Sequence, residues 1–525
     1  MGVTVPFGST RAGGAMIACA DQLATQAGMS ILALGGNAVD AAIATNAALA
    51  VTAPHLCGMG GDLFALVHDG ATVHALNATG RAGAGSDAQA LRSEGHTEMP
   101  FRHDIRTVTV PGCVDGWCAL HERFGSLQLA QILEPAIRLA TDGFPASPLL
   151  VGVLATLDAR GRKSLSEVAR QAVRRGARVQ RPGAARALQA ISREGRNGFY
   201  LGEFGDGLHQ LGSGLFSDAD LSTPGSTWVN ALSRPAFGKV LHSIPPNSQG
   251  YLVLGGAALA DLLDLPSEPD DPQWPHLLIE AAKAAAFDRP RVLHDGADGD
   301  ALLDTIAQRV GTIDRERATH GEVPTFDGDT TYLCVVDQQR MGVSLIQSNA
   351  SNFGSWLVEP NTQINLHNRG LGFSLQMGHP GELSAGRRPP HTLSPTLATN
   401  PDGSLAAVVG TMGGDGQPQI LVQLAARLLY HAQSPAAALH APRWILHGPV
   451  TGFDTWTAPH GPHVLVEGHA PKEWRDGLTN RGHDVRMSPA YDSGFGHAHV
   501  IVVEPNGMLC GAADPRSRVG SVAGL

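Results

Sequence analysis

The chain has few charged residues, few aromatic residues and few cysteines. Charged residues make up 16 % and aromatic residues 5 % of its 525 positions, where a globular protein averages about 25 % charged residues. No run of Lys or Arg accompanies the net charge of −10, so we expect no nucleic-acid partner. Glycine is abundant instead, with 64 residues, and it permits tight turns and close approach of backbones.

Long apolar segments and a leader sequence are also missing. No stretch approaches the roughly 18 apolar residues of a membrane-spanning helix, and residues 1–6 lack the basic and apolar regions of a secretory signal. The six cysteines are scattered, which is typical of buried thiols in a reducing compartment and not of a disulfide framework. We therefore expect a cytoplasmic protein without a membrane partner.

Hydrophobic residues form 43 % of the chain, enough for several cores or for one large layered domain. Gly35 and Gly36 should end a first helix, and Asn37 should cap a second. Apolar periodicity predicts helices at 14–34, 38–51, 127–142, 276–287 and 419–430, and strands at 63–67, 331–336, 341–347, 405–410 and 497–503. We further expect a helical, solvent-facing layer at 155–235, a surface loop at 261–275, and a mobile loop at 314–329 that suits a cleavage site.

Two adjacent threonines, Thr330 and Thr331, follow the acidic, turn-prone residues 326–329 and precede the apolar run 332–336. One interpretation is structural, because β-branched residues favour the start of a strand. The other is chemical: a threonine that becomes the first residue of a cleaved chain carries nucleophile and base together. Its Oγ attacks while its own α-amine, with a pKa of about 7.7–8.0, accepts the proton.

A glycine-rich turn around Gly413 and Gly414 joins the expected strand at 405–410 to the expected helix at 419–430. Such turns aim consecutive backbone N–H groups at one point, which suits an oxyanion or a phosphate. The alternative is a plain strand–turn–helix connection. The chain has no G-x-G-x-x-G motif and no P-loop lysine, and it lacks the G-x-S-x-G elbow of a serine hydrolase.

Ser348 lies on the strand expected after that of Thr330, where it could bond the nucleophile or be an exposed strand serine. Histidines number 23, and His497 and His499 should point the same way on one strand. No H-E-x-x-H and no C-x-x-C motif accompanies them, so we expect neither a metal nor another cofactor.

A series of short motifs runs through nearly the whole chain. They occupy residues 35–42, 58–62, 110–112, 136–140, 142–145, 198–200, 245–250, 329–331, 394–396, 413–414 and 514–516. In this order they resemble the gamma-glutamyltranspeptidase family of N-terminal-nucleophile hydrolases. So many motifs in one order argue strongly against a chance match.

The resemblance implies an α+β fold, a four-layer αββα sandwich made as one precursor that cleaves itself between Asp329 and Thr330. Residues 1–329 would be the large subunit and residues 330–525 the small one, both within one domain, and a homodimer of such processed heterodimers is one assembly that fits. It also implies that Thr330 is nucleophile and base, that Ser348 supports it, and that the Gly413 and Gly414 amides form the oxyanion hole.

Several positions depart from the family pattern. Counted forward from Thr330 without a gap, the acidic residue that binds a substrate α-amino group becomes Gly372, the glutamine before it becomes Arg369, the catalytic-loop asparagine becomes Ala350 beside Asn349, and the paired serines become His391 and Thr392. We take Arg369, Asn349, His391 and Thr392 as candidate substrate-binding residues. Arg92 and Arg102 are candidates for the arginine that grips the α-carboxylate.

The altered positions leave three hypotheses for function. The first is a self-processing amide hydrolase and acyltransferase that cleaves gamma-glutamyl, glutathione-like amides through a threonine acyl-enzyme, with water or an amine as acceptor. The second is a hydrolase of other small amides, similar to oxamate amidohydrolase or to cephalosporin and glutaryl acylases. Arg369 would then anchor a substrate carboxylate, unless it is a surface salt-bridge residue. The third and remote hypothesis is an inactive, uncleaved scaffold.

Overall fold

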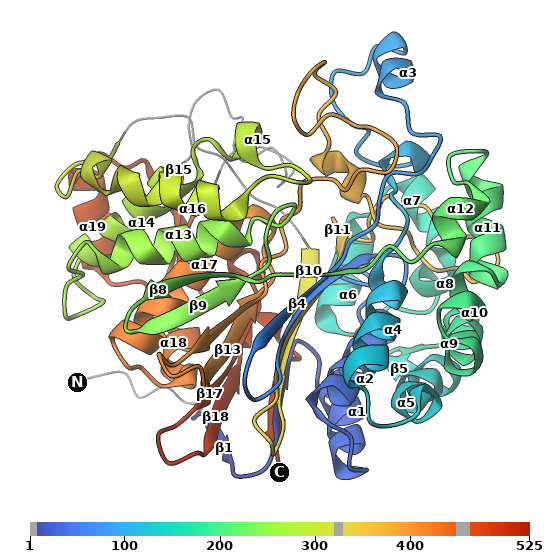
Figure 1. Ribbon diagram of the computed structural model, residues 1–525, viewed down its shortest axis with the longest axis horizontal. Coiled ribbons are helices and arrows are strands. Elements are labelled where there is room, and N and C mark those ends of the chain that lie inside the picture. Colours follow the sequence, from blue (N-terminus) through green and yellow to red (C-terminus); the bar gives the residue numbers. More distant parts are fainter. Residues whose placement is uncertain (1–7, 320–328, 448–462) are drawn as a thin grey trace.

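Two facing β-sheets form the centre of the molecule (Figure 1). The computed structural model describes residues 8–319, 329–447 and 463–525. In spatial order the first sheet contains β19 (Ser521–Gly524), β2 (Met16–Cys19), β10 (Asp329–Val336), β11 (Gly342–Ala350), β3 (Asp62–His68), β4 (Val73–Ala78) and β7 (Thr227–Val229). The second contains β1 (Thr10–Ala12), β18 (Leu509–Ala513), β17 (Ala498–Val503), β13 (Leu405–Thr411), β12 (Thr396–Thr399), β9 (Lys239–Ser243) and β8 (Leu232–Ala236).

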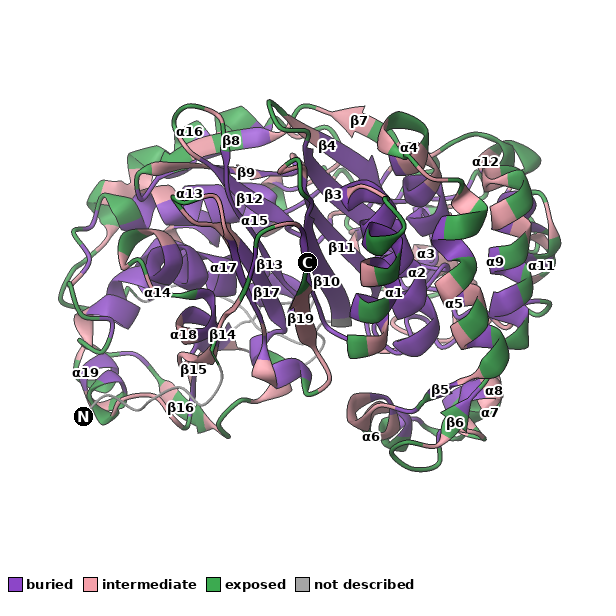
Figure 2. Ribbon diagram, turned by 90° about the horizontal axis from the view of Figure 1, so that it is seen from below, coloured by how far each residue is buried: buried purple, intermediate pink, exposed green. Residues whose placement is uncertain are grey.

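A layer of helices covers the outer face of each sheet, which gives four layers in the order αββα (Figure 2). The helices over the first sheet are α1 (Gln22–Ala33), α2 (Ala38–Thr52), α4 (Cys113–Phe124), α5 (Leu129–Asp142) and α9 (Pro182–Glu194). Those over the second sheet are α13 (Gly250–Asp261), α14 (Gln273–Ala286), α16 (Gly299–Ala307) and α17 (Gln417–Ala425), which a short π-helix (Ala426–Tyr430) continues. The predicted sandwich is confirmed.

Shorter elements surround this frame. The helices are α3 (Ala88–Ser93), α6 (Pro148–Thr156), α7 (Ala159–Ser164), α8 (Ser166–Ala169), α10 (Arg196–Tyr200), α11 (Glu203–Gly212), α12 (Asp218–Ser222), α15 (Arg289–Val292), α18 (Pro435–His440) and α19 (Lys472–Asn480). The strands are β5 (Phe144–Pro145), β6 (Arg178–Val179), β14 (Trp444–His447), β15 (His463–Glu467) and β16 (Val485–Ser488).

Helix α2 is buried along its whole length. Its small side chains allow α1 and α5 to pack against it closely, as the sequence predicted. The Asn37 side chain accepts bonds from the amides of Val39 and Asp40, and the Asp40 carboxylate accepts a bond from the Asn37 amide. This capping box fixes where the helix begins.

The alternation of side chains along β10 decides which threonine faces the space between the sheets. Tyr332 and Cys334 belong to the apolar core between the sheets, whereas Leu333 contributes to the core beneath the helices. Because successive side chains point to opposite faces of a sheet, Thr330 shares the inter-sheet face and the residue after it faces the helices.

Each sheet combines strands from both sides of residue 330. In the first sheet β2, from upstream of this point, pairs with β19 and β10, which both lie downstream. In the second sheet β12 pairs with β9 from upstream and β13 from downstream. The division into 1–329 and 330–525 therefore does not separate the two sheets, and it stays a prediction.

Some expectations need correction. The helix predicted at 14–34 begins only at Gln22, because Met16–Cys19 forms the fully buried strand β2, and a strand covered on both faces lacks the alternation that reveals it. The layer predicted at 155–235 is helical through Ser222, then ends in β7 and β8. Of the loop predicted at 314–329, residues 320–328 lie outside the described residues.

The described helices include none that is long and apolar enough to cross a membrane. All six cysteines are free thiols. Five of them are buried and Cys118 is half-buried, in agreement with their predicted role as small core residues.

Candidate active site

Thr330 lies where the pairing between β10 and β11 is interrupted. Asp329 pairs with Ala350 and Thr331 with Gln347, so Ser348 and Asn349 together face the single residue Thr330. Such bulges re-aim side chains and are frequent beside active sites. The Thr330 side chain is 1 % exposed and lies on the face between the sheets.

Ser348 supports Thr330 directly. The Thr330 hydroxyl donates a hydrogen bond to Ser348 Oγ over 3.1 Å, and the Ala350 amide donates to the same oxygen over 2.8 Å. Ala350 itself has a φ of 73°, a left-handed conformation that is costly for a residue with a Cβ. The predicted contact between Thr330 and Ser348 is therefore present, and the alternative of an exposed strand serine is wrong.

Arg369 extends this hydrogen-bonded group. Its guanidinium donates to Ser348 Oγ over 3.4 Å and to Thr392 Oγ1 over 3.2 Å. The side chain is 1 % exposed, so the alternative of a surface salt-bridge residue is wrong. Burial lowers the pKa of Arg369 to about 10, an effect that the charges of Asp62 and Asp415 oppose. At neutral pH a buried cation thus stands next to the hydroxyl that contacts Thr330.

Asp62, on the inter-sheet face of the first sheet, lies beside two histidines. Asp62 pairs with Ser348 across β3 and β11, and its carboxylate lies 3.3 Å from His391 Nε2 and 3.5 Å from His367 Nδ1. Burial, and then the neighbouring Arg369 cation, lower the pKa of His391 to about 3, so this ring is neutral. Burial would raise the pKa of Asp62, but the two rings and the Gly80 amide outweigh it and hold that pKa at about 2.

The glycine turn lies next to this group. Gly413 and Gly414 adopt φ values of 133° and 50°, and within the described part of the chain neither amide donates to a group outside the turn. The Gln249 side chain donates to Gly414 O over 3.1 Å and to Thr392 O over 2.8 Å, which fixes the turn to the residues that surround Arg369.

Arg289, which precedes Thr330 in the chain, also reaches the turn. Arg289 Nη2 lies 3.0 Å from the buried carboxylate of Asp415. Both charges contribute to the potential at Arg369, with Asp415 favouring its charged form and Arg289 opposing it. The turn is thus held from two sides, by Gln249 and by Arg289.

Three candidates from the sequence lie elsewhere. The Asn349 side chain donates to Pro54 O over 3.1 Å, on the helix side of the first sheet. Arg92 pairs with Glu382 at 2.7 Å, and the Arg102 guanidinium lies over the Trp356 ring at 3.9 Å. These contacts do not connect with the Thr330 group.

Asp62, Gln249 and Arg289 have no role predicted from the sequence, although the structure connects all three with the site. Asp62 and Gln249 lie inside the motifs 58–62 and 245–250, so the motifs contained a signal for them. Arg289 stands in no motif and could not have been found.

The four layers, with a threonine at the start of a central strand, define the fold of an N-terminal-nucleophile hydrolase. Enzymes of this class transfer acyl groups from amides to water or amines. The chain belongs to the gamma-glutamyltranspeptidase family, because the sequence model of that family, described as Gamma-glutamyltranspeptidase, matches residues 24–524. The predicted family and enzyme class are confirmed.

Individual relatives carry several different names. A glutathione hydrolase-like YwrD proenzyme of Bacillus subtilis (strain 168) is 33 % identical, with 97 % of this chain and 98 % of that protein aligned. An oxamate amidohydrolase proenzyme of Klebsiella pneumoniae is also 33 % identical, over 96 % of this chain and 97 % of that one. The crystal structure of a cephalosporin acylase from Bacillus halodurans matches with a TM-score of 0.90 at 32 % identity, covering 100 % of this chain and 98 % of that chain.

Proposed function

We propose that this protein is a self-processing amide hydrolase and acyltransferase whose nucleophile is Thr330. The observation that carries the proposal is the 3.1 Å hydrogen bond from Thr330 to Ser348 at the interrupted start of β10. Thr331 is the weaker candidate because it faces the helix layer, where its hydroxyl donates to Gln347 O over 3.4 Å.

Processing would follow from the same geometry. The Thr330 hydroxyl loses its proton to water and its Oγ attacks the carbonyl carbon of Asp329. The 329–330 C–N bond breaks, the nitrogen takes up a proton as the new α-amine, and an ester joins Asp329 to Thr330 Oγ. Water then hydrolyses the ester, which leaves a carboxylate on Asp329 and a free amine on Thr330.

Turnover would use the freed amine as base. It takes the proton of Thr330 Oγ as this oxygen attacks the substrate amide, and the Gly413 and Gly414 amides stabilise the oxyanion that forms. The amine then passes the proton to the leaving nitrogen, and an acyl-enzyme ester remains. Water or a second amine attacks this ester and regenerates Thr330.

Gamma-glutamyl amides such as glutathione are the first substrate candidate, and family membership supports them. A buried cation at Arg369 can hold a carboxylate on the acyl group, since guanidinium and carboxylate pair in a planar, bidentate way. Thr392 positions this arginine, and His391 lies beside it as a neutral ring. All three are proposed substrate-site residues, whereas the placement of Asn349 excludes it from our proposal.

A second candidate is an amide whose acyl group has a carboxylate but no α-amino group, such as a glutaryl amide or oxamate. Gly372 favours it, because a Cβ at this position would lie 2.2 Å from Pro390 O. The acidic residue that would bind an α-amino group has no room there. The name of the oxamate amidohydrolase relative agrees with this substrate class, because oxamate has a carboxylate and no α-amino group.

Intact-mass analysis and N-terminal sequencing test the nucleophile. The chain has a mass of 54.8 kDa, and cleavage ahead of Thr330 would divide it, in proportion to residue number, into fragments of about 34 and 20 kDa. We expect Thr330→Ala to remain one inactive chain and Thr331→Val, the matched control, to be cut and active. Cleavage in Thr330→Ala would move the nucleophile to Thr331, and a wild-type protein that stays whole would favour the scaffold hypothesis.

Two p-nitroanilides and oxamate together distinguish the substrates. Gamma-glutamyl-p-nitroanilide and glutaryl-p-nitroanilide differ by the α-amino group, and oxamate tests a much smaller amide. Preference for the gamma-glutamyl compound would support the first candidate, and preference for glutaryl or oxamate the second.

Two further parts of the proposal concern assembly and location. We propose a homodimer of processed heterodimers, which light scattering on the purified protein would test. A cytoplasmic location is supported by the six free thiols, and cell fractionation would test it.

A further inference from the structure

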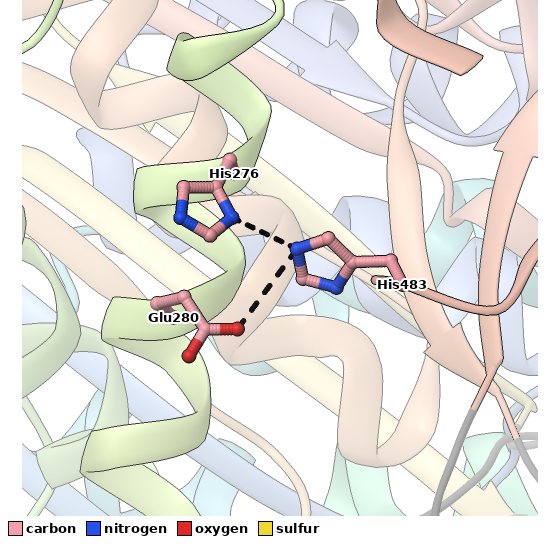
Figure 3. Close-up of side chains that lie close together, drawn as sticks. All are labelled: His276, Glu280 and His483. Atoms are coloured by element: carbon pink, nitrogen blue, oxygen red, sulfur yellow. Dashed lines mark hydrogen bonds and ion pairs between the residues drawn. The ribbon is translucent and has the colours of Figure 1, made fainter. Parts of the chain in front are cut away.

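Three buried side chains with metal-binding atoms lie close together (Figure 3). His276 and Glu280 lie one turn apart on α14, and His483 comes from the connection between α19 and β16. One ligand atom from each of the three lies within 4.8 Å of those from the others. His276 is 0 %, Glu280 1 % and His483 6 % exposed.

The spacing of these atoms matches a single small cation. His276 Nδ1 lies 2.9 Å from His483 Nε2, which lies 3.9 Å from Glu280 Oε1. Zinc binds imidazole nitrogen and carboxylate oxygen at about 2.0–2.2 Å in a tetrahedron, which separates neighbouring ligand atoms by roughly 3.3 Å. The two observed distances lie on either side of this value, and the ligand atoms of all three side chains lie within 4.8 Å of one another, so shifts of about an ångström or less would complete the geometry.

The outer contacts orient the ligands. His276 Nε2 lies 3.0 Å from the carbonyl oxygen of Asp314, so this nitrogen carries the proton and Nδ1 presents its lone pair to His483. Metal-ligating histidines characteristically give their other N–H to a carbonyl or carboxylate. Glu280 Oε2 accepts bonds from the Thr319 amide, at 3.1 Å, and from the Thr319 hydroxyl, while Glu280 Oε1 faces His483.

We propose that His276, Glu280 and His483 form a binding site for a divalent transition-metal ion, and that zinc fits this donor set. Two imidazoles and one carboxylate are ligands that zinc accepts in proteins. The site would tie α14 to the α19–β16 connection and, through Asp314 and Thr319, to the last residues that the structure describes before residue 329.

Lys283 sharpens the test because it competes for the same oxygen. Its ammonium lies 2.8 Å from Glu280 Oε1 and 3.1 Å from Thr319 O, and its side chain is more exposed than those of the ligands. A cation bound to Glu280 must displace this ammonium. Removing the charge of Lys283 should therefore favour a metal ion at Glu280, whereas it would break a simple ion pair between Lys283 and Glu280.

The experiment measures metal bound to the whole protein. Protein stripped with a chelator and dialysed against zinc chloride should hold about one zinc ion per chain by mass spectrometry of the metal, with zinc affinity determined by calorimetry. Loss of a ligand in His483→Gln or His276→Gln should weaken binding by roughly 100-fold or more, since even the outer partners of a ligand are worth 10–100-fold. His209→Gln, on α11 and outside the cluster, should bind zinc like the wild type.

Lys283→Met supplies the second measurement. It should bind zinc at least about tenfold more tightly than the wild type, because the competing ammonium is gone and the ligands are kept. The proposal fails if the wild type takes up no more zinc than the His276→Gln/His483→Gln double variant. It also fails if Lys283→Met binds more weakly than the wild type. Neither result depends on the activity of Thr330.

Discussion

Replacing Arg369 with methionine separates binding of a substrate carboxylate from support of the nucleophile. Methionine keeps a long unbranched side chain but removes the buried guanidinium that contacts Ser348 and Thr392. A hydrogen bond to a charged group contributes about 1.5–3 kcal/mol, so a lost carboxylate contact of about 3 kcal/mol should lower kcat/KM for glutaryl-p-nitroanilide by roughly 100-fold. Butyryl-p-nitroanilide has no carboxylate, and its kcat/KM should change by less than about fivefold, which corresponds to 1 kcal/mol.

The control for this substitution is Arg388→Met. Arg388 is also buried, with its pKa likewise lowered to about 10 by burial, but it donates to Thr79 O and Gly225 O instead of to the Ser348 group. It should leave the ratio of glutaryl to butyryl turnover unchanged. An equal loss for both substrates in Arg369→Met would refute the carboxylate contact and would show that Arg369 acts through Ser348.

Stability gives a second measurement on the same variant. Burial lowers the pKa of Arg369 to about 10, so the folded state carries its charge at a cost of about 3 kcal/mol, at 1.36 kcal/mol for each pKa unit. Methionine avoids this cost. Arg369→Met should therefore unfold in denaturant at the wild-type concentration or above it, while losing activity toward glutaryl amides.

Three further predictions concern single positions. Gly372→Asp should lower stability by about 2 kcal/mol or more and should not improve gamma-glutamyl turnover, because its Cβ would lie 2.2 Å from Pro390 O. Ala350→Gly should raise the free energy of unfolding by about 0.5–1 kcal/mol, since glycine tolerates a φ of 73°. His499→Phe should flatten the acid side of the stability profile: burial lowers the pKa of this ring, which stacks on Tyr332, to about 3. The unfolded state therefore binds the extra proton below pH 6.5, stability falls as pH drops toward 3, and the ring's share at pH 5 is about 2 kcal/mol.

Denaturant unfolding checks these three variants. A stable Gly372→Asp protein with faster gamma-glutamyl turnover would show that an acid fits this turn after all. A loss of stability in Ala350→Gly would mean that the left-handed conformation carries no strain. For His499→Phe, the difference from wild type at pH 5 minus that at pH 7.5 is decisive, and equal differences would contradict a neutral buried ring.

Local sequence patterns are enough to predict much of the fold and the centre of the site. The compact apolar run after the turn-prone residues 326–329 and the capping residue at Asn37 act over a few residues, so β10 and α2 could be predicted nearly to their ends. Ser348 followed from the spacing of two neighbouring strands. The strand at Met16–Cys19 could not be predicted in the same way, because burial on both faces removes the polar positions that distinguish a strand from a helix.

Long-range packing decided the remainder of the site. Arg369 is buried because the turn that follows it lies against distant backbone: a Cβ at Gly370 would meet Thr107 O at 2.6 Å. No pattern near residue 369 contains that information. The bulge that directs Thr330 toward Ser348 leaves Asn349 on the opposite face, and a count along the sequence cannot show this.

The pairing of strands from both sides of residue 330 within one sheet has a thermodynamic consequence. Strand β2 lies between β19 and β10. A protein cut ahead of Thr330 would therefore be two polypeptides that cannot dissociate while β2 remains paired with either of these strands. Once melted, they would have to find each other in solution, so recovery would be second order in concentration, whereas the whole precursor refolds alone. The lifetime of the cut form on heating would then be set by its rate of unfolding. Cut and uncut protein would differ more in the reversibility of heat inactivation than in its midpoint temperature.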